Sequence, residues 1–165
     1  MTMRSIRAVA VLGALMLGIL PSAVADAAGC TVCICSVSAT SMNFGTYNPA
    51  ASGATTASAT INASCVSVTL AMNATVELGL SAGTSGNAAA RQMANGATRL
   101  NYNIYQDAAY ATVWGNGSNG GSQQTMQIVN LLSFNSTKTA YGRIPAGQYV
   151  RTGPYTDSVV VTFTF

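Results

Sequence analysis

The chain has 165 residues, of which 49% are hydrophobic and only 7% are charged, with seven basic residues, four acidic residues and no histidine. The lack of histidine excludes His-based catalytic triads and most zinc sites, and four carboxylates leave little material for acid–base catalysis. The basic residues are few and scattered, so nucleic acid and anionic membranes are poor candidates as partners.

The first 25 residues have the pattern of a secretory signal peptide. Two arginines precede an apolar run over residues 8–20, and the small residues 22–25 follow it. We expect cleavage between residues 25 and 28, with Asp26 as the favoured first residue of the mature chain. The apolar run is too short for a membrane span, so we predict export and no stable membrane insertion. Loss of the two arginines lowers the formal net charge from +3 to +1.

Alternation of apolar and polar residues dominates the rest of the chain. Apolar residues occupy every even position from Val66 to Leu80, a period of two that predicts a half-buried strand. This run is long for one strand, so we expect a turn or bend near Asn73. The alternation recurs over residues 59–65, 100–104 and 159–165. Stretches rich in Gly, Pro and Asn separate these runs, which predicts a single all-β domain, an antiparallel sandwich.

All four cysteines lie beyond the predicted signal peptide, at Cys30, Cys33, Cys35 and Cys65. An exported chain reaches an oxidising compartment, so disulfides are expected, although the sequence alone does not choose among three possible pairings. We favour a bond between Cys35 and Cys65, which would join two early strands, with Cys30 and Cys33 pairing or staying free. Zinc and redox-dithiol sites fit poorly, because three of the cysteines crowd an N-terminal tail.

Two further patterns have ordinary structural explanations. Residues 115–120 match the glycine spacing of a dinucleotide-binding loop, but no helix pattern follows, so we expect a flexible loop. Among the carboxylates only Asp107 and Asp157 are plausible catalysts, and Asp107 follows a predicted strand, where turn formers are common. We predict no catalytic residue, no cofactor and no metal site.

Four aromatic residues leave a binding function open. Trp114 with Tyr102, Tyr105 and Tyr110 could line a sugar site, as in a small secreted carbohydrate-binding module. The alternative is packing inside the sandwich. We favour packing, because Tyr102 is in phase with the apolar residues of its predicted strand.

Three stretches of the chain, in this order and spacing, resemble one protein family. The first is residues 35–49, which contains Phe44-Gly45-Thr46-Tyr47-Asn48-Pro49. The second is residues 80–117, with Arg91, Tyr102, Asp107 and Trp114. The third begins at Tyr141-Gly142-Arg143 and includes Gly147, Tyr155 and Asp157. Together they cover nearly all of residues 35–165 and resemble the spore coat protein U domain family, which includes the pilins of archaic (Csu-type) chaperone-usher fimbriae.

The resemblance implies an incomplete immunoglobulin-like β-sandwich that lacks its last strand. Family members pair the cysteine of the opening motif with one that ends the second strand, which corresponds to Cys35 and Cys65 here. A periplasmic chaperone would lend the missing strand, an outer-membrane usher would export the subunit to the cell surface, and a neighbouring pilin would supply the strand in the fibre. The implied role is structural, in a fimbria serving adhesion or biofilm formation. A spore or cell coat protein is the alternative.

The predicted last strand agrees with an incomplete sandwich. Its apolar residues alternate to the end of the sequence, and an apolar strand at a sheet edge needs a partner. We expect four residues to line a donor-strand groove: Val159, Val161, Phe163 and Phe165. Residues 26–34 form a short N-terminal extension before the domain of residues 35–165. An extension of this length, with few alternating apolar anchors, predicts a weak donor strand.

Overall fold

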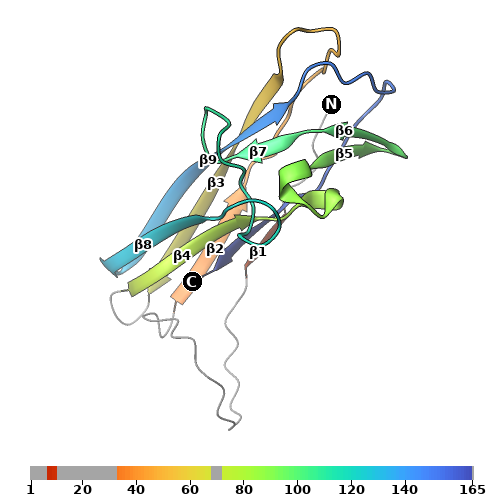
Figure 1. Cartoon of the computed structure of the whole chain (residues 1–165). Coiled ribbons are helices and arrows are strands. Elements are labelled where there is room, and N and C mark those ends of the chain that lie inside the picture. The colour runs from red at the N-terminus through yellow and green to blue at the C-terminus, as the bar shows by residue number, and fades with distance from the viewer. Residues whose placement is uncertain (1–6, 11–32, 68–71, 165) are drawn as a thin grey trace.

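The computed structural model describes residues 7–10, 33–67 and 72–164 (Figure 1). Within these ranges strands predominate, joined by loops and two short 3₁₀ turns, η1 (Gly83–Ser85) and η2 (Ala88–Ala90). The strands are β1 (Arg7–Ala10), β2 (Cys33–Ala39), β3 (Thr55–Ser67), β4 (Met72–Leu80), β5 (Gln92–Asn95), β6 (Thr98–Asn101), β7 (Asn103–Tyr105), β8 (Gln124–Leu131), β9 (Ser133–Ile144) and β10 (Val160–Thr164).

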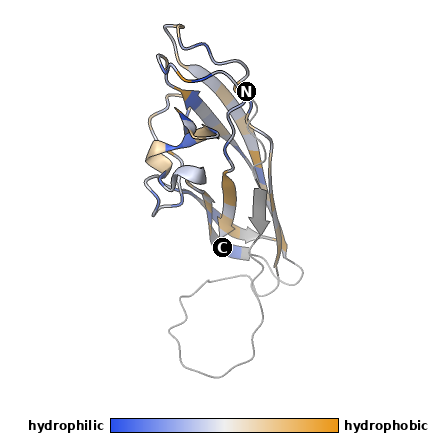
Figure 2. Ribbon diagram, turned by 90° about the vertical axis from the view of Figure 1, so that its right-hand side faces the viewer, coloured by the Kyte–Doolittle hydropathy of each residue, from blue (hydrophilic) through white to orange (hydrophobic). Residues whose placement is uncertain are grey.

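The strands form two four-stranded sheets and one small hairpin. The first sheet has the order β1-β10-β4-β8, the second has the order β2-β3-β9-β7, and β5 pairs with β6. The two large sheets face each other as layers of a sandwich (Figures 1 and 2). Among the described strands every pairing is antiparallel except that of β1 with β10. The predicted all-β sandwich is confirmed.

The core lies between the sheets and follows the alternation in the sequence (Figure 2). In β3 the odd-numbered residues from Ala59 to Cys65 are buried, whereas in β4 the even-numbered residues Val76, Leu78 and Leu80 are buried. Both strands therefore place one face on the core and the other on solvent. The largest fully buried side chains are those of Trp114, Arg91, Tyr155, Met42, Ile61, Leu78, Leu80, Met93, Leu100 and Ile104.

The long apolar run is divided earlier than the sequence suggested. Strand β3 continues through Ser67, so Val66 belongs to it and faces solvent, and β4 starts at Met72. The inward-facing parity changes from odd in β3 to even in β4, which requires a break between them. The bend expected near Asn73 corresponds to a shift in register with β8, between Met72 and Ala74.

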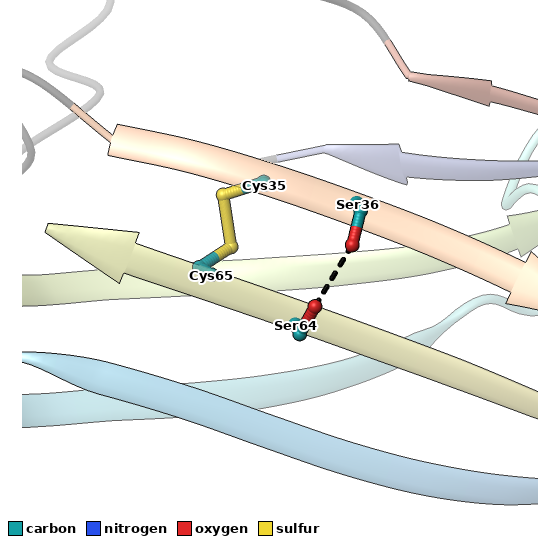
Figure 3. Close-up of a disulfide and its surroundings, with 4 residues drawn as sticks. All are labelled: Cys35, Ser36, Ser64 and Cys65. Carbon is teal, nitrogen blue, oxygen red and sulfur yellow. Dashed lines mark hydrogen bonds between the residues drawn. A yellow bond between two sulfur atoms is a disulfide. The ribbon is translucent and has the colours of Figure 1, made fainter.

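The favoured disulfide is confirmed. Cys35 in β2 lies directly opposite Cys65 in β3, and their sulfur atoms are bonded with the Cα atoms 4.1 Å apart (Figure 3). The next residues, Ser36 and Ser64, point to the outer face and share a hydrogen bond of 2.8 Å between their Oγ atoms. The bond therefore fastens edge strand β2 to the centre of its sheet.

The second predicted pair is tested only in part. Cys33 is disulfide-bonded. Cys30 lies outside the described residues, so the Cys30–Cys33 pair stays a prediction.

Replacing both Cys35 and Cys65 with Ser should lower the free energy of unfolding by roughly 2–5 kcal/mol, because the reduced chain gains freedom when it unfolds. Denaturant unfolding under non-reducing conditions measures the change. Ser36→Ala is the matched control: it removes one exposed hydrogen bond beside the disulfide and should cost about 1 kcal/mol or less. Equal unfolding midpoints for the double variant and the control would contradict a stabilising role for the disulfide.

Candidate functional site

Strand β10 lies between a strand of the sandwich and a strand from the start of the chain. On one side it pairs antiparallel with β4, with Val161 opposite Leu80. On the other side it pairs in parallel with β1, so that Arg7 lies opposite Val160. Strand β1 falls inside the predicted signal peptide. Its removal would leave β10 as a sheet edge with unpaired backbone N–H and C=O groups.

Strand β2 forms the second border of the same region. It is the edge strand of its sheet, where β3 is its neighbour. Strand β1 contacts β2 as well as β10, and β10 also approaches β2 directly. Strand β1 therefore lies on the side of the sandwich where the edges of the two sheets meet (Figure 1). Without β1 this side of the core would be open between β10 and β2.

The predicted groove residues share one face of the chain. Val159, Val161 and Phe163 are buried in the core, while Thr162 between them is only partly buried. This burial refers to the chain with β1 beside β10. Phe165 lies outside the described residues. The structure thus places three of the four residues on one face, Val159 just before β10 and Val161 and Phe163 within it, and their contact with a donor strand stays a prediction.

The boundary of the predicted extension needs a correction. Strand β2 begins at Cys33, so Cys33 and Ile34 pair with Ser67 and Val66 inside the sandwich. The backbone of Ile34 is therefore part of the domain, and its side chain is 69% exposed. The sequence did not reveal this boundary, because an isoleucine that faces solvent cannot be distinguished by residue type from an apolar anchor of a donor strand. Residues 26–32, the rest of the extension, lie outside the described part of the chain.

The four aromatic residues considered for a sugar site divide into two groups. Trp114 and Tyr102 are buried, and the indole Nε1 of Trp114 donates a hydrogen bond of 2.9 Å to the carbonyl oxygen of Leu78. These two rings pack in the core, as the favoured alternative predicted, and cannot line a surface site. Tyr105 and Tyr110 are half-buried at the surface, with ring centroids 5.5 Å apart in an edge-to-face arrangement.

The two carboxylates considered as catalysts have structural partners. Asp107 accepts hydrogen bonds from the backbone N–H groups of Ala111 (3.0 Å) and Thr112 (2.8 Å), and these bonds lower the pKa of Asp107. It therefore stabilises a turn, as the sequence predicted. Residues 115–120 form a loop, as expected, and a hydrogen bond from the N–H of Gly115 to the carbonyl oxygen of Ser122 closes it; the expected flexibility stays a prediction.

A buried arginine organises the end of the sandwich where β10 begins. The Nη2 atom of Arg91 donates to the carbonyl oxygens of Ser81 (2.6 Å) and Trp114 (2.7 Å), and Nη1 donates to Oδ1 of Asn103 (3.0 Å). Burial penalises the charged guanidinium and lowers the pKa of Arg91 to about 10, so the side chain stays protonated at neutral pH. Sequence reasoning did not assign Arg91 a role, because no local pattern distinguishes a buried arginine.

Asp157 is the second charged group in this region. Its carboxylate is buried and accepts hydrogen bonds from the hydroxyl of Tyr102 (2.7 Å) and from the backbone N–H groups of Thr84 (2.9 Å) and Ser158 (2.8 Å). The close approach of this carboxylate explains Gly83, which has a φ of 67° and where a Cβ would collide with Asp157. Asp157 thus fixes the chain just before β10.

Ser81 connects this network to β10 itself. The N–H of Ser81 donates to the carbonyl oxygen of Val160, and Ser81 Oγ accepts from the N–H of Val160, both at 2.9 Å. Arg91 bonds the carbonyl oxygen of the same serine. The buried network therefore sets the starting point of the strand that borders the open side.

Arg91→Met should lower the free energy of unfolding by roughly 3–5 kcal/mol, because it leaves several buried acceptors without donors and Asp157 without its counter-charge. Denaturant unfolding measures the loss. Arg99→Met is the matched control, since Arg99 is exposed in the hairpin and bonds only nearby carbonyl oxygens; it should cost about 0.5 kcal/mol or less. Similar costs for the two variants would contradict a structural network centred on Arg91.

Tyr102 should resist ionisation at alkaline pH. Burial, followed by the negative charge of Asp157, raises the pKa of Tyr102 above its ordinary value of about 10. Because the folded pKa exceeds the unfolded one, the stability that Tyr102 contributes is complete below about pH 10 and declines as pH rises towards the folded pKa. In tyrosinate absorbance titrations, Tyr102→Phe should match the wild type while both are folded and differ in denaturant. A difference in the folded state near pH 10 would refute the buried hydrogen bond.

Two further findings on the described residues concern metal ions and membranes. They include no cluster of three or more His, Cys, Asp or Glu side chains that could bind a metal ion. The same part of the chain has no helix long and apolar enough to cross a membrane. Among the described strands the distinctive feature is the parallel pairing of β10 with β1.

Comparison with known proteins gives matches at the level of both sequence and fold. The Spore Coat Protein U domain matches residues 22–162. The chain is 33% identical to "Protein U" of Myxococcus xanthus over 132 residues, which are 75% of this chain and 71% of that protein. Among solved structures, a similar fold occurs in the CsuC–CsuE chaperone–tip adhesion subunit pre-assembly complex from archaic chaperone-usher Csu pili of Acinetobacter baumannii.

The likeness to that complex concerns the fold. The TM-score is 0.53 at 23% identity, over 81% of this chain and 40% of the matched chain, so this protein spans less than half the length of that structure's chain. The family itself is settled by the domain match and by the identity with Protein U. The chain belongs to the Spore Coat Protein U domain family.

Proposed function

We propose that this protein is a non-enzymatic structural subunit of a surface fimbria, assembled by the chaperone-usher pathway through donor-strand complementation. The observation that carries the proposal is the parallel pairing of β1 with β10, in which a strand from outside the predicted mature domain occupies the edge of its first sheet. Family membership supports the proposal, as does the fold shared with a subunit bound to its chaperone.

Removal of the signal peptide is the step that would create the acceptor site. Cleavage after Ala25 takes β1 away and exposes both the backbone edge of β10 and the side chains of Val161 and Phe163. Each such side chain contributes roughly 1.5–3 kcal/mol when it is buried again. A periplasmic chaperone would supply the first replacement strand, and a neighbouring subunit delivered through an outer-membrane usher would supply the permanent one.

The same subunit would accept a strand better than it donates one. Because β2 starts at Cys33, only residues 26–32 precede the sandwich in the predicted mature chain. A strand that spans the length of the sandwich needs roughly ten residues. The disulfide at Cys33 further restricts the end of this segment. A poor donor suits a fibre end or a minor subunit, where adhesion is a common task.

A coat component is the second candidate, favoured by the description of the matched family, Spore Coat Protein U domain. Strand exchange would then build a layer on the cell or spore surface instead of a fibre. Catalysis fits neither candidate, because Asp107 caps a turn and Asp157 is buried in the network. The fimbria is preferred because a subunit with a single acceptor edge joins one partner there, which favours linear assembly over a layer.

The mature chain starting at Asp26 should be unstable or self-associating alone, and a peptide of alternating apolar residues should stabilise it. At roughly 100 times its Kd the peptide adds about 2.7 kcal/mol, a rise in melting temperature of roughly 5–15 °C. Differential scanning fluorimetry measures this shift. Phe163→Ala should weaken peptide binding, whereas Thr162→Ala, on the outer face of the same strand, should not.

Co-expression with the chaperone and electron microscopy of the released subunit complete the test. Short assemblies that need another subunit as donor support the proposal. A stable monomer that ignores strand peptides would refute strand acceptance. Long fibres of this chain alone would refute the poor-donor role while leaving strand acceptance intact.

A further inference from the structure

The outer face of the second sheet carries a cluster of aromatic and cationic side chains, away from the edge of β10. Tyr105 in β7 lies opposite Tyr141 in β9, and Arg143 is two residues further along β9 on the same face. Tyr110 packs on Tyr105 from the following loop. We call Tyr105, Tyr110, Tyr141 and Arg143 the aromatic platform. The three tyrosines are half-buried and Arg143 is exposed.

Tyr110 is held in a conformation that large residues avoid. Its φ is 57°, and within the described ranges it is the one non-glycine residue with a positive φ. The loop is nonetheless well fixed: Tyr110 N–H donates to the carbonyl oxygen of Asp107, and the side chain of Gln106 bonds Ser122. Glycine or asparagine would fit this backbone with less strain. A tyrosine at such a strained position favours a binding role for its aromatic ring.

Arg143 is placed to recognise an anion. Its Cζ atom lies 5.4 Å from the centroid of the Tyr110 ring, a cation–π contact that orients the guanidinium. A stacked guanidinium keeps its N–H donors in plane for a carboxylate. No carboxylate of the described residues forms a salt bridge with Arg143, and its own sheet supplies none. The charge is therefore available to a ligand.

The surface beside the platform is neutral and rich in hydroxyl and amide groups. Outward-facing positions of β3 and β9 next to the platform are Thr56, Ser58, Thr60, Asn62, Thr137 and Thr139. Asn62 and Thr137 already share a hydrogen bond of 2.9 Å. Such side chains exchange hydrogen bonds readily with sugar hydroxyls, while a single arginine is far too little positive charge for nucleic acid.

A second copy of this chain is a poor occupant. Among the described residues the carboxylates are Glu77, Asp107 and Asp157. Asp157 is buried, and Asp107 is engaged by backbone N–H groups of its own turn. Glu77 lies on the first sheet, at its outer face. The described residues thus offer little with which to match Arg143 of another copy, which favours an anionic group from a different molecule.

We propose that the aromatic platform binds a carboxylated polysaccharide. A uronic acid unit places its ring against Tyr105 and Tyr110 and its carboxylate on the guanidinium of Arg143. Neighbouring sugar units follow the hydroxyl-rich face of β3 and β9. This binding is independent of strand acceptance, because the platform and β10 belong to different sheets.

The test uses polygalacturonate as the acidic probe and dextran as the neutral one, with the exported chain purified from the periplasm and an alternating apolar strand peptide present throughout. Isothermal titration should detect polygalacturonate and little dextran. Arg143→Gln should weaken binding roughly tenfold or more, because it removes a charge-assisted hydrogen bond. Arg151→Gln, which removes an exposed arginine elsewhere, is the charge-matched control and should keep wild-type affinity.

Tyr110→Asn separates binding from folding. Asparagine relieves the backbone at a φ of 57°, so the melting temperature should stay within a few degrees of wild type while polygalacturonate affinity falls. Tyr149→Asn, at a tyrosine that is 80% exposed, is the control and should affect neither property. Equal losses for Arg143→Gln and Arg151→Gln, or equal binding of dextran and polygalacturonate, would overturn the proposal. Failure of fibre assembly alone would not bear on it.

Discussion

The edge of β10 that faces away from β4 is the constraint on which the rest of this structure depends. A strand with an apolar inner face and free backbone groups on one side must pair with something. In this chain the partner is β1, from the predicted signal peptide. If the proposed cleavage removes β1, the first sheet has a gap beside β10, and the stability of the domain then depends on whichever strand fills that gap.

Both borders of the gap are fixed independently of the strand between them. The disulfide between Cys35 and Cys65 fastens β2 to β3, and the network of Ser81, Arg91 and Asp157 fixes the start of β10. An acceptor whose walls are already in place loses less conformational entropy on binding than one that must first fold. Charged residues on an edge strand usually protect it against pairing with another strand. Neither β2 nor β10 contains a charged residue, so both edges remain open to pairing.

Several features followed from the sequence because they depend on period and local context. The alternation of apolar and polar residues located β3, β4 and β10. Tyr102 was expected in the core because it is in phase with the apolar residues Leu100 and Ile104. The sequence did not reveal that the buried positions change from odd-numbered in β3 to even-numbered in β4. Val66 continues the even-numbered apolar pattern of β4, although it belongs to β3 and faces solvent. The burial of Arg91 could not be predicted from the sequence either. Its hydrogen-bond acceptors come from separate parts of the chain, and only folding brings these oxygen atoms together.

The Tyr141-Gly142-Arg143 motif shows how one strand serves the core and the platform at once. Gly142 faces inward, where a Cβ would collide with Met42 and Phe44, so the missing side chain lets the opening motif pack flush against β9. Its two neighbours necessarily face outward, because successive side chains of a strand alternate. The same glycine that closes the core therefore places Tyr141 and Arg143 side by side on the surface. The alternation of β9 therefore has two consequences: Gly142 makes room for Phe44 in the core, and Arg143 is exposed on the outer face.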